Sequence, residues 1–518
     1  MGVLAVYDTV GIQNYIFSSN KLAENVGASK LVADIFAETL PSVIAKETKS
    51  DIFKWRDHKD APLTKGFSVE VIYEGGGNAY VAFKDEPTFQ QITEKFLVRV
   101  SIEAPGLGIA VAAINTDFSN EYKKDFELLN DRLTLVKGGF NIPVFAGNQP
   151  ITRQSGRIGL PVSSIDKSGE YLNNSQLLKR NRYTGYRLDE EIRHLDFNHL
   201  AFDKETDSLI AIIHVDGNNM GKKIKDYMEN RDDYTDAVPK IRQLSVKIND
   251  CYKNALDDTI EKFETAYQKY VEAEKKKSPS NENKKFPKNP LIKLISDGDD
   301  ITLVICGRFA IDFAVKLLFK IEETKDDDRP FIETKPTACA GVVIFHSHYP
   351  FSDAYKLVED LCSNAKKPSR DCEGSYIDFH LHQSGRVASL GDLRERLYKV
   401  EGKTILRRPW RVSNDENTYP NFKWFHDTIA KCEKEIPHNK LKKIRNAIGV
   451  NDDAAALAEN ELRGRKLPEF SIAPKRDDNG KIIMSDYAAY FDVLEMMDTY
   501  VNILSEKGAK DVNQDTTH

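Results

Sequence analysis

The chain has 518 residues, which is too many for one ordinary hydrophobic core and suggests about three or four domains. A formal net charge of −6 excludes a global basic field for nucleic acid, and 40% hydrophobic with 30% charged residues is typical of a globular protein. No apolar run reaches membrane-spanning length and no signal peptide opens the sequence, so we expect a cytoplasmic protein without membrane contact. The six cysteines form no C-x-x-C pair and predict free thiols.

Residues 1–115 form the first predicted unit, whose elements follow the order βαββαβ. These elements are the strand Val3–Tyr7 ending in Asp8, an amphipathic stretch Leu22–Ala45, strands Phe67–Tyr73 and Ala79–Phe83 around the turn Gly75-Gly76-Gly77-Asn78, the helix Pro87–Ser101 and the strand Gly108–Ile114. Residues 116–200 are predicted to be a connector with two basic loops, 152–157 and Lys179–Arg187. A solvated linker and a contact with phosphate or RNA both stay open for these loops.

Residues 201–385 repeat this order, so the chain contains an internal duplication of topology. The second unit has the strand Leu209–Val215, the loop Asp216–Gly221, a long helix Lys222–Glu272, a charged solvated segment 275–290, a hairpin of Leu291–Ile295 and Ile301–Ile305, the helix Phe309–Glu323, the strand Cys339–Phe345, the helix Asp353–Lys366 and an edge strand Ser375–Leu381. The turn of the hairpin is Asp297-Gly298-Asp299-Asp300.

Three carboxylates of this second unit are predicted to converge. In a βαββαβ unit the first two strands run parallel with the third between them, so the end of the first strand meets the tip of the hairpin. Asp216, Asp299 and Asp300 would then lie together, and a divalent cation would relieve their repulsion. We expect two Mg²⁺ or Mn²⁺ ions there, as in-line displacement at phosphorus requires, with the carbonyl of Gly217 or Val215 as a further ligand. An Asp-rich solvent turn is the alternative.

The loop after Asp216 is a candidate phosphate site, because it leads from a strand into a helix N-terminus with free backbone N–H groups. Lys222 lies in the first helical turn, where a cation is unfavourable without a nearby anion, and Lys366 ends a later helix. The nucleotide contacts predicted for the second unit are Gly217, Asn218, Asn219, Gly221, Lys222, Ser296, Asp297, Gly298 and Lys366.

The first unit keeps the strand-end acid Asp8 but has Gly77 and Asn78 where the second has Asp299 and Asp300. It therefore should not bind two metal ions in the same way. Glycines let a backbone approach a ligand closely, so we expect this unit to hold an acceptor nucleotide without performing chemistry. The residues predicted for that role are Asp8, Gly75, Gly76, Gly77 and Asn78.

Residues 386–505 are predicted to be a C-terminal helical domain, and residues 506–518 a frayed tail. The expected helices are Leu390–Val400, Trp424–Glu435, His438–Ile448, Asp452–Arg463 and Tyr487–Leu504. Two histidine pairs, His346 with His348 and His380 with His382, could ligate zinc, but ordinary core or surface histidines are favoured. A basic face containing Arg407, Arg408 and Arg411 is weighed against a solvated helix face.

The first unit, through Asp8, Gly11–Gln13 and Gly27–Ser29, resembles the first palm of the large polymerase-like subunit of type III CRISPR effector complexes. Val215–Gly221, Asp297–Asp300, Ala340–Ile344 and Ala365–Lys367 resemble its second, catalytic palm. The resemblance implies an α+β fold of tandem ferredoxin-like palm domains related to GGDEF and nucleotidyl cyclases, followed by a helical domain. Asp297 departs from the usual Gly-Gly of that turn. No HD nuclease motif is found, so a standalone relative is as good an interpretation as a complex subunit.

The family implies a nucleotidyltransferase with catalytic Asp299 and Asp300 that joins ATP into cyclic oligoadenylate second messengers for antiviral defence. ATP or another NTP is the expected substrate, and guide or target RNA or effector-complex subunits are expected partners; the sequence leaves oligomerisation open. Two alternatives remain: a non-catalytic RNA-binding scaffold subunit, and a regulator that binds a cyclic nucleotide without making it.

Overall fold

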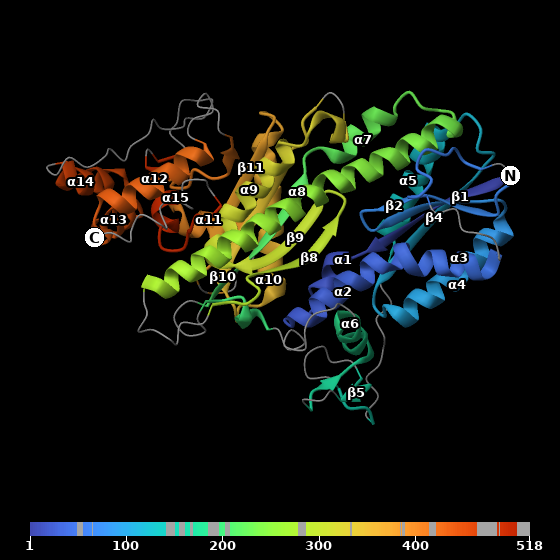
Figure 1. Cartoon of the computed structure of the whole chain (residues 1–518), viewed down its shortest axis with the longest axis horizontal. Coiled ribbons are helices and arrows are strands. Elements are labelled where there is room, and N and C mark those ends of the chain that lie inside the picture. The colour runs from blue at the N-terminus through green and yellow to red at the C-terminus, as the bar shows by residue number, and fades with distance from the viewer. Residues whose placement is uncertain are drawn as a thin grey trace.

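The structure is a computed structural model, and it describes residues 1–48, 55–64, 66–140, 151–154, 161–165, 169–184, 196–202, 208–277, 286–331, 334–383, 385, 389–413, 421–463, 484–485 and 487–504. Figure 1 shows an elongated molecule with a first sheet at the N-terminal end, a second sheet in the middle and the C-terminal helices at the opposite end. The expected frayed tail, residues 506–518, lies outside the described residues.

The first sheet has the order β2-β3-β1-β4, with the central strand β1 antiparallel to both neighbours. Helices α1 to α4 cover one face and α5 covers the other (Figure 1). The elements are β1 Gly2–Val10, α1 Ile12–Ile16, α2 Leu22–Asp34, the π-helical turn η1 Ile35–Thr39, α3 Leu40–Thr48, β2 Val69–Gly75, β3 Asn78–Phe83, α4 Glu86–Glu103, β4 Gly108–Thr116 and α5 Tyr122–Gly138.

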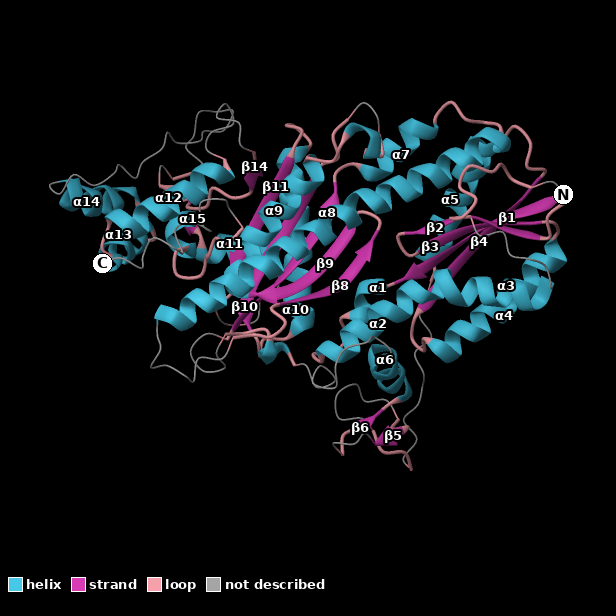
Figure 2. Ribbon diagram, viewed as in Figure 1, coloured by secondary structure: helices cyan, strands magenta, loops and turns pink. Residues whose placement is uncertain are grey.

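The second sheet has the order β14-β11-β10-β7-β9-β8 and is the larger magenta sheet of Figure 2. Its core β8-β9-β7-β10 repeats the arrangement of the first sheet, and β7 and β8 are parallel with β9 between them, as predicted. The elements are β7 Leu209–Gly217, α7 Met220–Met228, α8 Tyr234–Lys277, β8 Leu291–Asp297, β9 Asp300–Cys306, α9 Ala310–Glu322, β10 Ala338–His346, α10 Phe351–Ser369 and β11 Ser375–Leu381.

Between and beyond the two sheets lie shorter elements. They are β5 Ser164–Ile165, β6 Tyr171–Leu172, α6 Asn174–Thr184, α11 Leu390–Leu397, β12 Lys399–Val400, β13 Lys403–Thr404, β14 Trp410–Val412, α12 Phe422–Glu435, α13 His438–Ile448, α14 Asp452–Arg463 and α15 Ala488–Met496. The C-terminal region is therefore helical, as expected, but it lends one strand to the second sheet.

Four predicted elements are wrong in detail. The helix Lys222–Glu272 is broken into α7 and α8, because the carboxylate of Asp233 accepts the N–H of Thr235 and begins a new helix. The strand Ser375–Leu381 is not an edge strand, since β14 pairs with its outer side. The basic stretch Lys179–Arg187 is no loop over its described part, which ends helix α6. The last helix stops at Met496 rather than Leu504.

Some predicted segments fall on residues that are not described. Residues 278–285 of the charged segment 275–290 lie outside the described residues, as do 155–157 and 185–187 of the two basic loops.

The hydrophobic core does not divide into one cluster for each sheet. Side chains alternate between the two faces of a strand, so Leu4 and Val6 of β1 join one cluster while Val3 and Ala5 join the other. Each cluster also takes alternate residues of β7 and β9 from the second sheet. The two sheets are therefore packed side by side, with shared cores on both faces.

Helix α8 runs from the first sheet, where it begins, to the second (Figure 1). Near its start, Arg242 is fully buried and donates from Nε to the carbonyl of Ile72 at 2.7 Å and from Nη2 to Oε1 of Glu70 at 2.8 Å. Nη1 donates to the carbonyl of Ala61 at 3.0 Å. A guanidinium with this many acceptors fixes α8, and with it the second unit, against β2.

Candidate active site

The three predicted carboxylates come together at one rim of the second sheet. Strands β7 and β9 are paired up to Val215 and Ile301, so Asp216 and Asp300 are the next residues on the two strands. Asp299 lies in the tight turn between β8 and β9, which Gly298 enters with a left-handed φ of 58°. A split βαββαβ order predicts this meeting, and the structure agrees with it.

Negative charge at this rim is only partly compensated. Burial, followed by the nearby charge of Asp216, raises the pKa of Asp299 to about 6 and that of Asp300 to about 8. Oδ1 of Asp300 is buried, and no group in the described part of the chain donates a hydrogen bond to it. A divalent cation would stabilise carboxylates that are crowded together in this way.

Lys366 provides the cation present at the rim. It lies in the last turn of α10, and its Nζ contacts Oδ2 of Asp216 at 2.5 Å and donates to the carbonyl of Gly217 at 3.1 Å. The lysine therefore meets both the acid and the carbonyl that the sequence assigns to metal or nucleotide binding. About a quarter of its side chain, 25%, is exposed, so the ammonium can also face a phosphate.

Gly217 is needed because the hairpin approaches β7 closely. A Cβ atom on residue 217 would lie 2.6 Å from Oδ2 of Asp299 and 2.7 Å from the hydroxyl of Tyr252 on α8. The Tyr252 hydroxyl is held in place because it donates to the carbonyl of Thr337 at 3.3 Å, and Cβ of Asp299 would also lie only 2.9 Å away. Only glycine lets the Asp299 carboxylate reach the end of β7.

Sequence reasoning missed a set of residues behind Asp300. His214 of β7 is buried, and its Nδ1 lies 3.1 Å from Oγ1 of Thr302 and 3.4 Å from Oδ1 of Asp300. Burial lowers the pKa of His214 to about 4, so the ring is neutral near pH 7. Glu359 of α10 has its pKa raised to about 7 by burial. A histidine inside the apolar run of β7, two residues before the acid, was the available signal.

The loop after Asp216 divides into buried and exposed residues. Asn218 is buried, and its Nδ2 donates to Oγ1 of Thr337 at 3.1 Å and to the carbonyl of Gly374 at 3.0 Å, so this side chain holds the loop in place. Asn219 has a left-handed φ of 56° and precedes α7. Asn219, Gly221 and Lys222 are exposed beside the rim, as is Ser296 on β8. Contact of these residues with a nucleotide stays a prediction.

The turn of the first unit touches the hairpin of the second unit. Gly76 and Gly77 have φ values of 61° and 76°, and the carbonyl of Gly77 accepts from the backbone N–H of Thr9 at 2.9 Å. The N–H of Gly77 donates to Oδ2 of Asp297 at 3.2 Å. Asp297, the residue that departs from the family's Gly-Gly, therefore links the two hairpins.

The strand-end acid of the first unit already has a partner. Oδ1 of Asp8 lies 2.8 Å from Nζ of Lys137 in the last turn of α5, and Asn78 is its neighbour across the β1–β3 ladder. Burial raises the pKa of Asp8 in spite of this lysine. Asp8, Asn78 and the glycine turn lie at the same end of the first sheet, and their predicted nucleotide contact stays untested.

Among the described residues no three His, Cys, Asp or Glu side chains are already arranged around one point as metal ligands. The contact of Lys366 with Asp216 accounts for this, because one carboxylate is turned to an ammonium. The donor set itself suits Mg²⁺ or Mn²⁺: it has carboxylate oxygens, the carbonyl of Gly217 and the unpaired buried Oδ1 of Asp300. Metal ligation by Asp216, Asp299 and Asp300 thus fits the residues and stays a prediction.

Residues 209–372 match the family model described as Cas10/Cmr2, second palm domain. Over these residues the chain is similar to the second palm of Cas10/Cmr2 proteins. A chain of the Csm1–Csm4 cassette crystallised with pppApA is similar over 96% of this chain and 69% of that one, at 14% identity and a TM-score of 0.54. For the cassette with cA4 the same coverage holds, at 14% identity and a TM-score of 0.51. Csm1 of T. onnurineus matches at 15% identity, with 96% and 69% covered and a TM-score of 0.50.

No curated protein matches the Cas10-like chain. At these low identities the similarity to the solved structures concerns the fold. It confirms the predicted class of tandem palms followed by a helical region. The predicted boundaries at 115, 200 and 385 stay predictions. In the described part of the Cas10-like chain no helix is both long and apolar enough to cross a bilayer.

The histidine pairs have ordinary contacts. His346 accepts at Nδ1 from the backbone N–H of His348 at 3.2 Å, and both lie at the end of β10. His380 on β11 and His382, which directly follows that strand, are buried, and burial lowers the pKa of each ring. Nε2 of His382 lies 2.9 Å from the carbonyl of Gly385. All six cysteines are free thiols.

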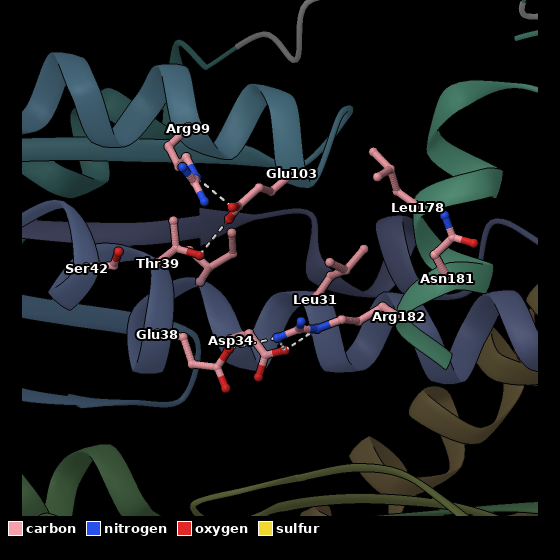
Figure 3. A pocket seen from close by; sticks show the side chains of 11 residues that line it. Leu31, Asp34, Glu38, Thr39, Ser42, Arg99, Glu103, Leu178, Asn181 and Arg182 are labelled. Atoms are coloured by element: carbon pink, nitrogen blue, oxygen red, sulfur yellow. Dashed lines mark hydrogen bonds and ion pairs between the residues drawn. The ribbon is translucent and has the colours of Figure 1, made fainter. Parts of the chain in front are cut away.

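A cavity of about 480 Å³ lies far from the acid rim, between α2, α3, α4 and α6 (Figure 3). Its charged side chains are paired with one another. Arg182 contacts Asp34 and Glu38, and Arg99 contacts Glu103, as the dashed lines in Figure 3 mark in part. Because these charges already neutralise each other, the cavity has fewer unpaired charges for a ligand than the acid rim has. We therefore take the rim as the candidate active site.

Proposed function

We propose that this Cas10-like chain is a metal-dependent nucleotidyltransferase that joins ATP into cyclic oligonucleotides, of the cyclic oligoadenylate type, as second messengers in antiviral defence. One observation carries the proposal. Carboxylates from two strands that are distant in sequence, Asp216 on β7 and the pair Asp299 and Asp300 at the β8–β9 turn, converge with excess negative charge beside a single lysine.

Each residue has a role in this proposal. Asp216, Asp299 and Asp300 would hold two Mg²⁺ or Mn²⁺ ions, which activate a sugar hydroxyl and stabilise the departing pyrophosphate. Lys366 would exchange its contact with Asp216 for a phosphate oxygen of the donor nucleotide. The N–H groups of the 217–221 loop, at the start of α7, would receive the remaining phosphate charge. Each step forms one phosphodiester bond and releases one pyrophosphate.

The similar solved structures support the choice of substrate class. Csm1–Csm4 cassettes are crystallised with pppApA, a linear adenosine dinucleotide, and with cA4. We infer adenosine nucleotides as substrates for this chain, with the first palm as the acceptor site, and association with other subunits of an effector complex inside the cell as part of the same proposal.

The scaffold alternative receives less support from the described basic residues. Arg180 donates to Glu24 and Glu170, and Arg182 contacts Asp34, so these arginines of α6 are neutralised inside the protein. A scaffold that binds RNA through α6 would have to break these pairs. At the acid rim, by contrast, Lys366 pairs with Asp216, and among the described residues no group donates a hydrogen bond to Oδ1 of Asp300.

The test is direct. Purified protein is incubated with each of the four NTPs and Mg²⁺ or Mn²⁺, and products are identified by mass spectrometry. We expect cyclic oligoadenylates from the parent and none from Asp299→Ala/Asp300→Ala. Asp327→Ala/Asp328→Ala is the matched control, because it removes two exposed carboxylates from a surface turn. Equal product from the parent and the Asp299→Ala/Asp300→Ala protein would refute the site.

A further inference from the structure

A cavity of about 470 Å³ lies where the end of α10 meets α11 and the segment 404–409. Clefts of this size commonly hold small molecules. Its lining is rich in cations and has a single acid, Asp371; the cations are Lys367, Arg394, Arg407 and Arg408.

Two of these cations are engaged by buried acids. Nη2 of Arg394 donates to Oδ1 of Asp378 at 2.6 Å. Nη2 of Arg408 donates to Oε2 of Glu495 at 2.5 Å. Arg408 is fully buried, yet its Nη1 has no hydrogen-bond partner in the described part of the chain. The favoured solvated helix face and the alternative basic face are therefore both wrong for Arg408, whose side chain is buried.

Arg407 and Lys367 are the available cations. Among the described residues no hydrogen-bond acceptor contacts the guanidinium of Arg407, whose Cζ lies 5.9 Å from the centre of the Trp410 ring. The backbone N–H of Arg407 donates to Oδ2 of Asp492 at 3.2 Å. Burial lowers the pKa of Arg407, although the charge of Asp492 opposes this shift. Lys367 is exposed at the end of α10 and has no described ion pair. A half-buried guanidinium without an acceptor is unfavourable until an anion arrives.

The rest of the lining suggests what the anion carries. Leu406, Pro409 and Met484 give the cavity an apolar wall beside the two cations. A guanidinium and an ammonium together suit the oxygens of a phosphate, and an apolar wall suits the flat face of a base. The cavity volume fits one nucleotide better than an extended strand.

We propose that this cavity binds the phosphate of a nucleotide-sized ligand through Lys367 and Arg407, at a site separate from the acid rim. Successive helical residues point about 100° apart, so Lys366 and Lys367 of α10 serve different surfaces. Lys366 reaches Asp216, whereas Lys367 lines the cavity. A ligand bound to Lys367 would therefore contact the last turn of α10, which also contains Lys366.

Binding is measured by titration calorimetry on the full chain, with EDTA present so that no divalent ion bridges a ligand to the acid rim. The probes are AMP, inorganic phosphate, adenosine and a short single-stranded RNA without a terminal phosphate. We expect AMP and phosphate to bind and adenosine to fail. Lys367→Ala/Arg407→Gln should weaken AMP by about tenfold or more, since both charge-assisted contacts are lost.

A matched control separates this site from its surroundings. Lys356→Ala removes an exposed lysine elsewhere on α10 and should bind AMP as the parent does. Thermal unfolding checks that each variant is folded, and Lys367→Ala alone serves if the double variant is not. Unchanged AMP binding in the double variant, equal binding of adenosine, or binding of RNA alone would each overturn the proposal.

Discussion

The two palms share a plan and differ at one turn. Each has a central strand that ends in an acid, Asp8 or Asp216, and each acid contacts a lysine at the end of a following helix, Lys137 or Lys366. Each has a tight hairpin whose last paired residues are Gly75 with Asn78 or Asp297 with Asp300. The first palm therefore retains the frame of an acid site and lacks only the acids of its turn.

The difference is also one of backbone. Both central residues of the first turn, Gly76 and Gly77, are left-handed, whereas only Gly298 is left-handed in the second. A side chain at residue 77 would be strained and would meet Ile12 and Thr9. Restoring the missing acid to the first palm would thus require a different turn as well as a different residue. Because the first turn has glycine at residue 77 in place of an acid, it packs directly against Ile12 and Thr9.

Separating the palms should have the largest effect. Arg242→Ala leaves Glu70 buried without its partner and should lower the free energy of unfolding by about 3–5 kcal/mol, measured by urea denaturation. Arg56→Ala is the control, because Arg56 is 50% exposed and lies 3.1 Å from Glu74 on the same strand. That variant should lose at most about 1 kcal/mol. Similar losses in both variants would show that α8 does not hold the palms together.

The strand-end acids test whether only one palm is catalytic. Asp216→Asn should lower kcat by about 10²–10³-fold, because one of the carboxylates proposed to hold the metal ions that stabilise the transition state is lost. Asp8→Asn should have a smaller effect, expressed mainly in KM, since this acid is expected only to hold an acceptor. Initial rates of product formation measure both. Equal losses of kcat would mean that the palms share the chemistry.

The C-terminal region packs against the second palm, and the titration of one acid, Asp312, tests this attachment. Oδ2 of buried Asp312 on α9 accepts the N–H groups of Ile503 and Leu504, both at 2.9 Å. Burial raises its pKa to about 6, above the ordinary value of 3.8, so its stabilisation is complete below pH 4 and is lost as the pH rises through 6. Asp312→Asn keeps an acceptor oxygen and should abolish this loss.

Relative to the parent, Asp312→Asn should gain up to about 3 kcal/mol of unfolding free energy between pH 4 and pH 7. Urea denaturation at the two pH values measures the gain, and the exposed Asp453→Asn should show none. A difference from the parent that does not change with pH would contradict the assignment.

The smallest effect separates the two glycines of the first turn. Gly76→Ala meets no atom within 4 Å, whereas a Cβ on residue 77 lies 2.5 Å from Cδ1 of Ile12 and 2.7 Å from Oγ1 of Thr9. Both variants pay for a left-handed φ, but Gly77→Ala should lose about 1–3 kcal/mol more because of the overlap. Thermal unfolding measures the difference, and equal stabilities would mean that the turn is looser than described.

The duplicated topology and the meeting of the acids could be predicted because both follow from local patterns. Alternating burial defines strands such as β1 and β7, and a split βαββαβ order brings Asp216 to the β8–β9 turn. The buried position of β11 could not be predicted, because the strand that covers it, Trp410–Val412, lies about thirty residues further along the chain.

Two helices, α5 and α6, were not predicted, because their many charged residues obscured the helical pattern of their buried residues. Helix α5 has the buried spacing Tyr122, Leu129 and Leu133, which is helical, within a stretch interpreted as a connector. In α6 a run of basic residues suggested a solvated loop, yet Lys179 is buried with its Nζ 2.7 Å from the carbonyl of Tyr15. Long-range acid partners such as Glu24 cannot be read from the run itself.

Helix α8 has a further consequence for how the molecule comes apart. Its 44 residues span about 66 Å at the α-helical rise, and it contributes to packing against both sheets. Because α8 is part of the packing of both palms, one palm cannot unfold while α8 stays folded against the other. Denaturation of the two halves should therefore be cooperative, with one sigmoidal transition for probes placed at either end.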